Sequence, residues 1–282
     1  MEFSVVITAF NCKRFIEKSL HSVFSQTYSP KEVIVIDDAS TDRTYPLLQR
    51  WGKKYPTLRV VRNKQNFERC KSRNLGVKLA KGDFVCFLDC DDLWLERYLE
   101  KTFEAINGGH SAVFGLPKVF VNSEGKITRK KKPPQDGFET LLFEGRVGYP
   151  SGSCFNRETF LRLGGYLQKY LMREDWEIFL RFYLAGEKVA FIPSHEYAIR
   201  EHSLRTSRGN KRFLQATLRV YKDYLKKTPD EFKPLLKYHL AVQLLRFNKK
   251  GIGRRLIFSL FVENPSLFKK GKRVWEALKR LF

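Results

Sequence analysis

Several features that define common protein classes are missing from this sequence of 282 residues. Its five cysteines form no CxxC pair, which argues against a zinc site and, with the odd count, favours a reducing compartment. No apolar run reaches the ~20 residues that a bilayer span needs, and the stretch from Leu256 to Val262 is far shorter. No basic segment with a cleavage site precedes the first apolar run, so we expect no targeting peptide. These absences favour a chain that is cytoplasmic or lies on a membrane.

The usual phosphate-binding loops are absent as well. A dinucleotide-binding sheet normally carries a GxGxxG turn after its first strand, whereas the corresponding turn here, TAFN at residues 8–11, has no glycine. There is no P-loop lysine motif either. If this chain binds a nucleotide, something other than a backbone loop must neutralise the phosphates. A divalent cation held by carboxylates would do so.

Acidic residues are scarce, above all in the C-terminal quarter. The whole chain has a formal net charge of +23. Residues 206–282 hold 20 lysines and arginines against 5 acids, whereas the first 205 residues hold 33 against 25. We therefore predict a domain of residues 1–205 and a basic helical region of residues 206–282. Because basic surfaces bind polyanions, a non-catalytic protein that binds nucleic acid or an acidic polymer is one alternative.

Short β-branched runs alternate with segments of helical periodicity in the first part. The predicted strands and helices follow one another as Val5–Ala9, Arg14–Phe24, Val33–Asp37, Asp42–Trp51, Leu58–Arg62, Lys71–Ala80 and Phe84–Asp89. This alternation predicts an α/β fold with a mostly parallel sheet flanked by helices. Ligands of such sheets bind beyond the carboxyl ends of the strands. Asn11, Asp37, Asp38 and the run from Asp89 to Asp92 all fall at those ends.

The pattern is less regular after residue 110. We predict a strand from Ala112 to Val121, a loop around the basic run Arg129–Lys132, helical spacing over residues 158–185, and a strand from Val189 to Ile192. Beyond Thr206 the periodicity is helical throughout.

Two interpretations of the C-terminal helices stay open. In the last segment an apolar arc lies opposite lysines and arginines, as in helices that lie in a membrane interface; it consists of Val274, Trp275, Leu278, Leu281 and Phe282. Alternatively, the apolar faces pack on one another or on the first domain, as we expect for the stretch from Leu214 to Phe247.

The run Asp89-Cys90-Asp91-Asp92 carries the clearest chemical signal. Carboxylates so close together raise one another's pKa unless a cation neutralises them. Mg²⁺ and Mn²⁺ prefer such oxygen ligands. A structural role is the alternative, because Asp91 or Asp92 could cap a helix from Leu95 to Ile106. Taken alone, the run does not decide between the two.

The motifs around this run occur in a characteristic order. They are SVVITAFN at residues 4–11, VIVIDDASTD at 33–42, SRNLG at 72–76, GDFVCFLDCDD at 82–92, GGY at 164–166 and EDW at 174–176. Together they closely resemble the family 2 glycosyltransferases over residues 3–205. The resemblance implies a GT-A fold, which is a Rossmann-like sheet flanked by helices, with the C-terminal helices as an appendage. It also implies an enzyme that moves a sugar from a nucleoside diphosphate to an acceptor hydroxyl.

The resemblance further implies roles for individual residues. It places Thr8, Phe10, Asn11, Asp37, Asp38, Arg73 and Asp89 at the donor nucleotide, with Phe10 against the base and Asp38 accepting from the base edge. It assigns Asp89, Asp91 and His202 to a Mg²⁺ or Mn²⁺ ion, with Asp91 as the main ligand. Asp175 matches the general base, and Ser151, Ser153 and Trp176 would flank the acceptor. Thr8, Ala39 and Phe67 depart from the commonest family residues, which are proline at the first position and glycine at the other two.

Each of these roles has a plainer alternative. Asp175 could instead pair with Arg173 or Arg181 on the same helical stretch. His202 could be structural, and Ser151, Ser153 and Trp176 could serve turns and the core.

The resemblance also predicts the reaction. With one general base and no second carboxylate nucleophile indicated, a direct displacement should invert the anomeric carbon of a UDP-linked donor. We expect a glycan or lipid-linked acceptor in cell-surface polysaccharide synthesis, on the cytoplasmic face of an anionic membrane that the C-terminal helices contact. A sugar-phosphate nucleotidyltransferase is a second alternative, but its glycine-rich basic first turn is absent. No specific nucleic-acid partner is expected, because such a function leaves Asp37, Asp38, Asp91 and Asp175 unexplained.

Overall fold

In the computed structural model of the chain, residues 1–117, 119–132, 136–192, 196–202 and 211–268 are described. The chain forms two compact units. The first comprises residues 1–134, 149–168 and 181–205, and the second comprises residues 135–148, 169–180 and 206–282. The second unit thus includes two segments that precede residue 205. A simple domain boundary at that residue stays a prediction.

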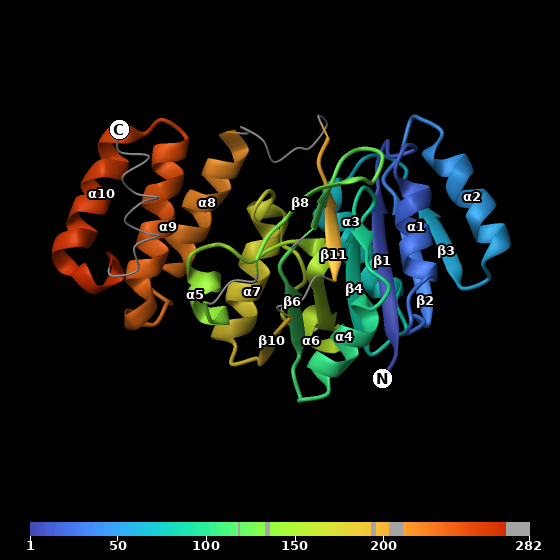
Figure 1. Cartoon of the computed structure of the whole chain (residues 1–282), viewed down its shortest axis with the longest axis horizontal. Coiled ribbons are helices and arrows are strands. Elements are labelled where there is room, and N and C mark those ends of the chain that lie inside the picture. The colour runs from blue at the N-terminus through green and yellow to red at the C-terminus, as the bar shows by residue number, and fades with distance from the viewer. Residues whose placement is uncertain (118, 133–135, 193–195, 203–210, 269–282) are drawn as a thin grey trace. The chain divides into compact units, whose positions relative to one another are not determined.

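The first unit is built on a seven-stranded, mostly parallel sheet (Figure 1). Its spatial order is β10 (Val189–Ile192), β6 (Ala112–Gly115), β9 (Ser153–Asn156), β4 (Phe84–Asp89), β1 (Phe3–Ala9), β2 (Glu32–Asp37) and β3 (Leu58–Arg62). The strands β4, β1, β2 and β3 pair in parallel, as the alternating sequence pattern predicts. β9 runs antiparallel to both of its neighbours, β4 and β6.

Helices cover both faces of this sheet (Figure 1). α1 (Ile16–Phe24), α2 (Thr44–Lys54) and α4 (Tyr98–Ile106) contribute to the core on one face, and α3 (Glu68–Leu79) packs on the other, beside α6 (Arg157–Arg162). Successive β1 side chains point to opposite faces, so Val5 and Ile7 join the first core. Val6 meets α3 at Gly76, where a Cβ would lie 2.4 Å from the Val6 side chain. Glycine at this position therefore allows α3 to approach the sheet.

A smaller, four-stranded sheet belongs to the same unit. Its order is β5 (Leu93–Trp94), β11 (Tyr197–Arg200), β7 (Val119–Val121) and β8 (Ile127–Lys130). The single strand predicted from Ala112 to Val121 is wrong, because β6 and β7 belong to different sheets with Pro117 between them. The loop predicted around Arg129–Lys132 is also partly wrong. All four residues of β8 are exposed, so the strand has no alternation for sequence reasoning to detect.

The helical spacing predicted over residues 158–185 proves to hold two α-helices. These are α6 and α7 (Glu174–Leu184), and a short 3-10 helix, η2 (Gln168–Tyr170), lies between them. Another short 3-10 helix, η1 (Pro150–Gly152), precedes β9.

The second unit is helical. It contains α5 (Phe138–Phe143), the first seven residues of α7, η3 (Asp230–Phe232), η4 (Pro265–Phe268) and the helices α8 (Lys211–Tyr224), α9 (Lys233–Arg246) and α10 (Lys250–Glu263). α9 is the central helix, since ten of its 14 residues are buried. Leu214 of α8 joins Leu240 and Leu244 of α9 in one cluster, so the packing interpretation holds for this stretch.

A separate prediction concerns the far C-terminus. The apolar arc from Val274 to Phe282 lies outside the described residues, which end at Phe268. Among the described helices, none combines the length and the apolar composition that crossing a bilayer requires.

Candidate functional site

The carboxyl ends of β1, β2 and β4 lie at one edge of the large sheet. The register pairs Ala9 with Asp37 and Thr8 with Asp89, which brings together the polar residues that follow these strands. Asn11 links two of the strand ends. Its side-chain oxygen accepts a hydrogen bond from the Thr41 N–H at 2.8 Å, and its own N–H donates to Ser40 Oγ at 3.0 Å. Asn11 therefore shapes the turn beside the predicted donor site.

Asp37 and Asp38 have different surroundings at the end of β2. Asp38 Oδ1 accepts from Asn63 Nδ2 at 2.7 Å, the Phe67 N–H at 3.0 Å and Ser72 Oγ at 2.9 Å. Asp37 is fully buried and pairs with Arg62 at 3.2 Å, and burial raises its pKa. Its Oδ1 has no hydrogen-bond partner among the described residues. Asp37 thus keeps one acceptor atom that no described residue uses. The predicted contact of Asp38 with the base stays a prediction.

Two of the residues at this edge relate directly to the family pattern. Phe10 is 47% exposed, which leaves its ring accessible to a flat ligand such as a nucleotide base. Ala39 has a φ of 61°, in the left-handed region that glycine adopts readily. An alanine at this position keeps the turn at a cost of roughly 1–2 kcal/mol.

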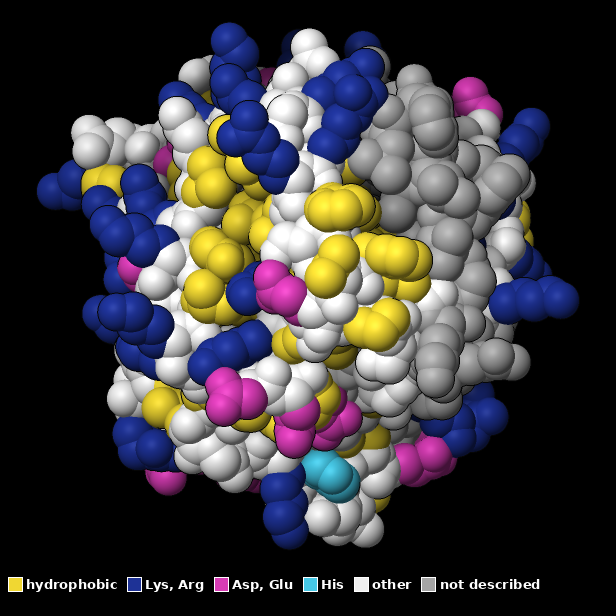
Figure 2. All heavy atoms as spheres, turned by 90° about the vertical axis from the view of Figure 1, so that its left-hand side faces the viewer, with side chains coloured by type: hydrophobic (Ala, Val, Ile, Leu, Met, Phe, Trp, Pro, Cys, Tyr) yellow, Lys and Arg dark blue, Asp and Glu magenta, His cyan; other side chains and the backbone are white. Residues whose placement is uncertain are grey.

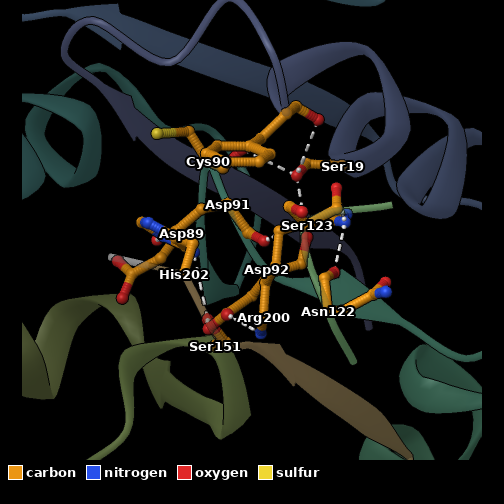
Figure 3. A network of polar contacts seen from close by, with 11 residues as sticks. Ser19, Asp89, Cys90, Asp91, Asp92, Asn122, Ser123, Ser151, Arg200 and His202 are labelled. Atoms are coloured by element: carbon orange, nitrogen blue, oxygen red, sulfur yellow. Dashed lines mark hydrogen bonds and ion pairs between the residues drawn. The ribbon is translucent and has the colours of Figure 1, made fainter. Parts of the chain in front are cut away.

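Asp89, Asp91 and Asp92 form an acidic centre after β4. One carboxylate oxygen from each of the three residues lies within 4.8 Å of the other two (Figure 3). Arg73 Nη2 donates to Asp89 Oδ1 at 2.6 Å, and the Arg73 guanidinium lies 5.4 Å from the centre of the Tyr166 ring. These contacts hold Asp89 in place at the strand end.

His202 contacts the acidic centre. Its Nε2 contacts Asp91 Oδ2 at 2.8 Å, and its ring packs against Phe15 at 4.8 Å between centroids. Its Nδ1 is buried without a hydrogen-bond partner among the described residues. The structure therefore brings together all three residues that the resemblance assigns to a metal ion.

Asp92 is absent from the metal site that the sequence predicts, yet it completes the acidic centre. It accepts from Ser151 Oγ at 2.6 Å and from the Arg200 N–H at 3.0 Å. Burial raises its pKa well above the usual value, and the charges of Asp91 and Asp89 raise it further. A cluster of three carboxylates, of which one is buried and two are partly exposed, fits a divalent cation.

The alternative capping role for these aspartates is wrong. α4 begins at Tyr98, its N-cap residue is Arg97, and no side chain caps it. Asp91 and Asp92 precede β5 instead.

Arg200 is the main residue that sequence reasoning missed. It is fully buried on β11, and its Nε donates to the Asp91 carbonyl oxygen at 2.8 Å. Its Nη1 donates to the carbonyl oxygens of Asn122 at 3.2 Å and Ser123 at 2.9 Å (Figure 3). One side chain thereby connects the acidic turn to the loop between β7 and β8. Its position two residues before His202 is the one sequence feature that could have pointed to this role.

Arg200→Lys should weaken Mn²⁺ binding about tenfold, because lysine cannot bond the same three carbonyl oxygens in a fixed plane. Calorimetric titration of the metal, beside a thermal melt, measures the effect. Arg129→Lys is the matched control, since Arg129 is half-exposed on β8 and pairs with Glu201. Equal Mn²⁺ affinity of the Arg200 variant and the wild type would show that the acidic turn does not depend on this anchor.

The serines of the predicted acceptor region have separate roles. Ser151 Oγ donates to Asp92 and accepts from the Asp89 N–H at 3.1 Å, so it belongs to the acidic centre. Ser153 Oγ donates to the Tyr149 carbonyl oxygen at 2.8 Å, which is a turn contact.

Asp175 lies in the second unit, in the first turn of α7. It is half-buried, and its Oδ1 accepts from the Trp176 N–H at 2.9 Å. Trp176 is fully buried, and its Nε1 donates to the Leu142 carbonyl oxygen at 2.7 Å, so this residue serves the core of its unit. The role of Asp175 as a general base stays a prediction.

Arg173 and Arg181, the arginines considered as ion partners of Asp175, make the following contacts, and their pairing with Asp175 stays a prediction. Arg173 Nη2 lies 3.0 Å from His239 Nε2, and its guanidinium lies over the Trp176 ring. Burial, and then the charge of Arg173, hold the pKa of His239 well below its usual value, so a neutral ring faces the guanidinium. Arg181 donates to the carbonyl oxygens of Leu163 and Gly165.

The chain matches a known protein-family model over much of its length. Residues 4–164 match the model described as Glycosyl transferase family 2. Because this match covers more than half of the chain, the chain belongs to that family. The resemblance found in its motifs is confirmed.

Named relatives and solved structures agree with this assignment. WfaP of Escherichia coli, a "UDP-Glc:alpha-D-GlcNAc-diphosphoundecaprenol beta-1,3-glucosyltransferase", is 40% identical over 49% of this chain and 55% of its own length. The "Putative teichuronic acid biosynthesis glycosyltransferase TuaG" of Bacillus subtilis is 38% identical over 36% of this chain and 40% of its own length. The chain thus spans about half the length of these relatives.

The fold of this chain is similar to that of solved glycosyltransferase structures. The crystal structure of Staphylococcus aureus TarS 1-349 in complex with UDP-GlcNAc matches with a TM-score of 0.67 at 20% identity, over 100% of this chain and 80% of that one. At this identity the match shows the fold alone. The predicted α/β fold of the GT-A type is confirmed.

Proposed function

We propose that this chain is an inverting, metal-dependent glycosyltransferase. It moves a sugar from a UDP-linked donor to a hydroxyl of a glycan or lipid-linked acceptor in cell-surface polysaccharide synthesis. The acidic centre of Asp89, Asp91 and Asp92 at the carboxyl edge of the sheet carries the proposal, because this edge is where such sheets bind ligands. UDP-GlcNAc in the TarS structure and UDP-Glc in the name of WfaP support the donor class.

Asp89 and Asp91 would hold the Mg²⁺ or Mn²⁺ ion, with His202 contacting Asp91. A bound divalent cation supplies electrostatic stabilisation for the charge that develops on a diphosphate leaving group. Arg73 fixes Asp89, and Arg200 fixes the backbone of the acidic turn. These two arginines set the direction in which the carboxylates point.

Asp175 is the proposed general base. The acceptor oxygen forms a bond to the anomeric carbon while the bond from that carbon to the diphosphate oxygen breaks. The electron pair leaves with the nucleoside diphosphate, and the acceptor proton passes to a carboxylate oxygen of Asp175. A single displacement of this kind inverts the anomeric carbon, and the base contributes about 10²–10⁴-fold to the rate.

We further propose that the enzyme works at the cytoplasmic face of a membrane. The diphosphoundecaprenol acceptor named for WfaP supports a lipid-linked acceptor. The excess of lysine and arginine in residues 206–282, together with the apolar arc from Val274 to Phe282, supports contact with anionic lipid.

A panel of nucleotide sugars tests the proposal. The purified chain should hydrolyse a UDP-sugar slowly, with Mn²⁺ or Mg²⁺ required and a chelator abolishing the reaction. The same preparation should show no retention of nucleic acid at physiological salt. Tight nucleic-acid binding without hydrolysis of any nucleotide sugar would instead support the non-catalytic alternative.

A further inference from the structure

The outer face of α10 is unusually apolar for an exposed surface. Ile252, Phe258, Phe261 and Val262 are 61%, 71%, 56% and 64% exposed. Figure 2 looks onto the face that carries α10 and shows hydrophobic side chains gathered there between groups of lysines and arginines. Exposed apolar side chains are ordinary when scattered, but a group of large ones on one helix marks an interaction surface.

The opposite face of α10 packs against α9 in the core of the second unit. Gly253, Ile257 and Leu260 are buried, and a Cβ on Gly253 would lie 2.8 Å from Leu245 Cγ of α9. The helix therefore meets the core of its unit through one close-packed face. Phe261 packs against Phe268 of η4 at 5.5 Å between ring centroids, whereas Phe258 and Val262 stay exposed for a different contact.

The charges beside this outer face are mostly basic. Residues 246–263 contain five exposed basic side chains, which are Arg246, Lys249, Lys250, Arg254 and Arg255, against one exposed acid, Glu263. Arg255, Phe258 and Val262 follow one another at spacings of three and four residues, so they share one stripe of the helix. A basic residue beside a phenylalanine and a valine suits the boundary between lipid headgroups and acyl chains.

The same charge argues against two other occupants. Residues 269–282 contain six lysines and arginines and one acid, so this segment matches the surrounding charge in sign and does not complement it. A second copy of the chain would bring the same basic residues to the contact. An anionic lipid surface complements both the charge and the apolar stripe.

We infer that the outer face of α10 docks onto an anionic lipid membrane. Phe258 and Val262 enter the boundary below the headgroups, and Arg255 and Lys250 contact lipid phosphates. The inference rests on the proposed function, because contact with the membrane would bring the enzyme to a lipid-linked acceptor at the membrane surface. It assigns the contact to a helix other than the terminal segment that the sequence singled out.

Sedimentation of the full chain with vesicles tests this contact. The vesicles contain phosphatidylcholine alone or phosphatidylcholine with phosphatidylglycerol. The wild type should bind the anionic vesicles in a salt-sensitive manner. The double variant Phe258→Ser, Val262→Ser should lower the partition coefficient at least about tenfold, because two apolar side chains no longer leave water. Lys250→Gln with Arg255→Gln should remove the preference for anionic lipid.

Matched controls come from exposed residues of the first unit. Ile127→Ser with Leu161→Ser removes two exposed apolar side chains, and Arg50→Gln with Lys53→Gln removes two exposed charges from α2. Both control variants should bind like the wild type. A thermal melt of each variant confirms that it is folded.

Three results would overturn the inference. The first is unchanged vesicle binding by the Phe258, Val262 variant. This result would stand also if the double variant Trp275→Ser, Leu278→Ser abolished binding, because the contact would then belong to the terminal segment. The second is a wild type that does not bind anionic vesicles. The third is a wild-type dimer in sedimentation velocity that the Phe258, Val262 variant dissociates, since this would assign the face to a second copy.

Hydrolysis of a UDP-sugar in vesicle-free buffer separates this inference from the proposed function. The Phe258, Val262 variant should retain the wild-type rate, because none of the proposed site residues lies on α10. If the wild type hydrolyses no nucleotide sugar, the proposed function fails while the vesicle results still decide the docking face.

Discussion

Asp91→Asn should lower metal-dependent transfer by about 10³-fold while the protein remains folded. Asp91 is half-buried at the end of β4 and contacts His202, which an amide of the same size can still do. The amide lacks the negative charge that a hard divalent cation needs, so the loss should appear in Mn²⁺ affinity as well as in rate. Rates over a Mn²⁺ titration, together with a thermal melt, measure both effects.

The control for this substitution is Asp83→Asn. The Asp83 side chain is 59% exposed and accepts from the Glu2 N–H, so its neutralisation changes the charge by the same amount away from the acidic centre. It should leave transfer unchanged. Full activity of the Asp91 variant in the presence of a chelator would remove the metal from the proposed mechanism.

Asp175→Asn should lower kcat by about 10²–10⁴-fold with little change in donor affinity. The asparagine oxygen can still accept from the Trp176 N–H, so the first turn of α7 should keep its shape. The amide cannot take the acceptor proton. Calorimetry of UDP-sugar binding and a transfer assay with saturating donor separate the two effects.

Asp230→Asn is the matched control in the same unit, because the Asp230 side chain is 92% exposed on η3. It should behave like the wild type. A different pattern, with donor affinity lost in the Asp175 variant and the remaining rate near normal, would make Asp175 a binding residue and leave the general base to be found elsewhere.

Much of the donor side of the site could be predicted because it follows from local sequence. Each of β1, β2 and β4 is a short apolar run that ends in polar residues, and parallel strands put those ends at one edge. The sequence pattern therefore suffices to group Asp37, Asp89 and Asp91. Their grouping requires only the order of the strands.

The residues that hold the acidic centre in place, Arg200 and Ser151, could not be predicted in this way. Arg200 reaches the Asp91 carbonyl oxygen from a position 109 residues later in the chain, and Ser151 reaches Asp92 across 59 residues. Ser151 lies in η1 before β9 and Arg200 lies on β11, and both segments have weak periodicity. β9 lies antiparallel between β4 and β6, and no local sequence pattern predicts a strand in that position.

The sequence by itself determined the family, the parallel sheet and the carboxylates of the site, because short-range periodicity and motif spacing are properties of neighbouring residues. The tertiary structure decided which partners hold those carboxylates and which apolar side chains stay exposed. Ile257 and Phe258 are adjacent residues of α10, yet one is 6% exposed and the other 71%. Hydrophobicity alone cannot separate them, because burial depends on where α9 lies, and that position is set by contacts between residues far apart in the chain.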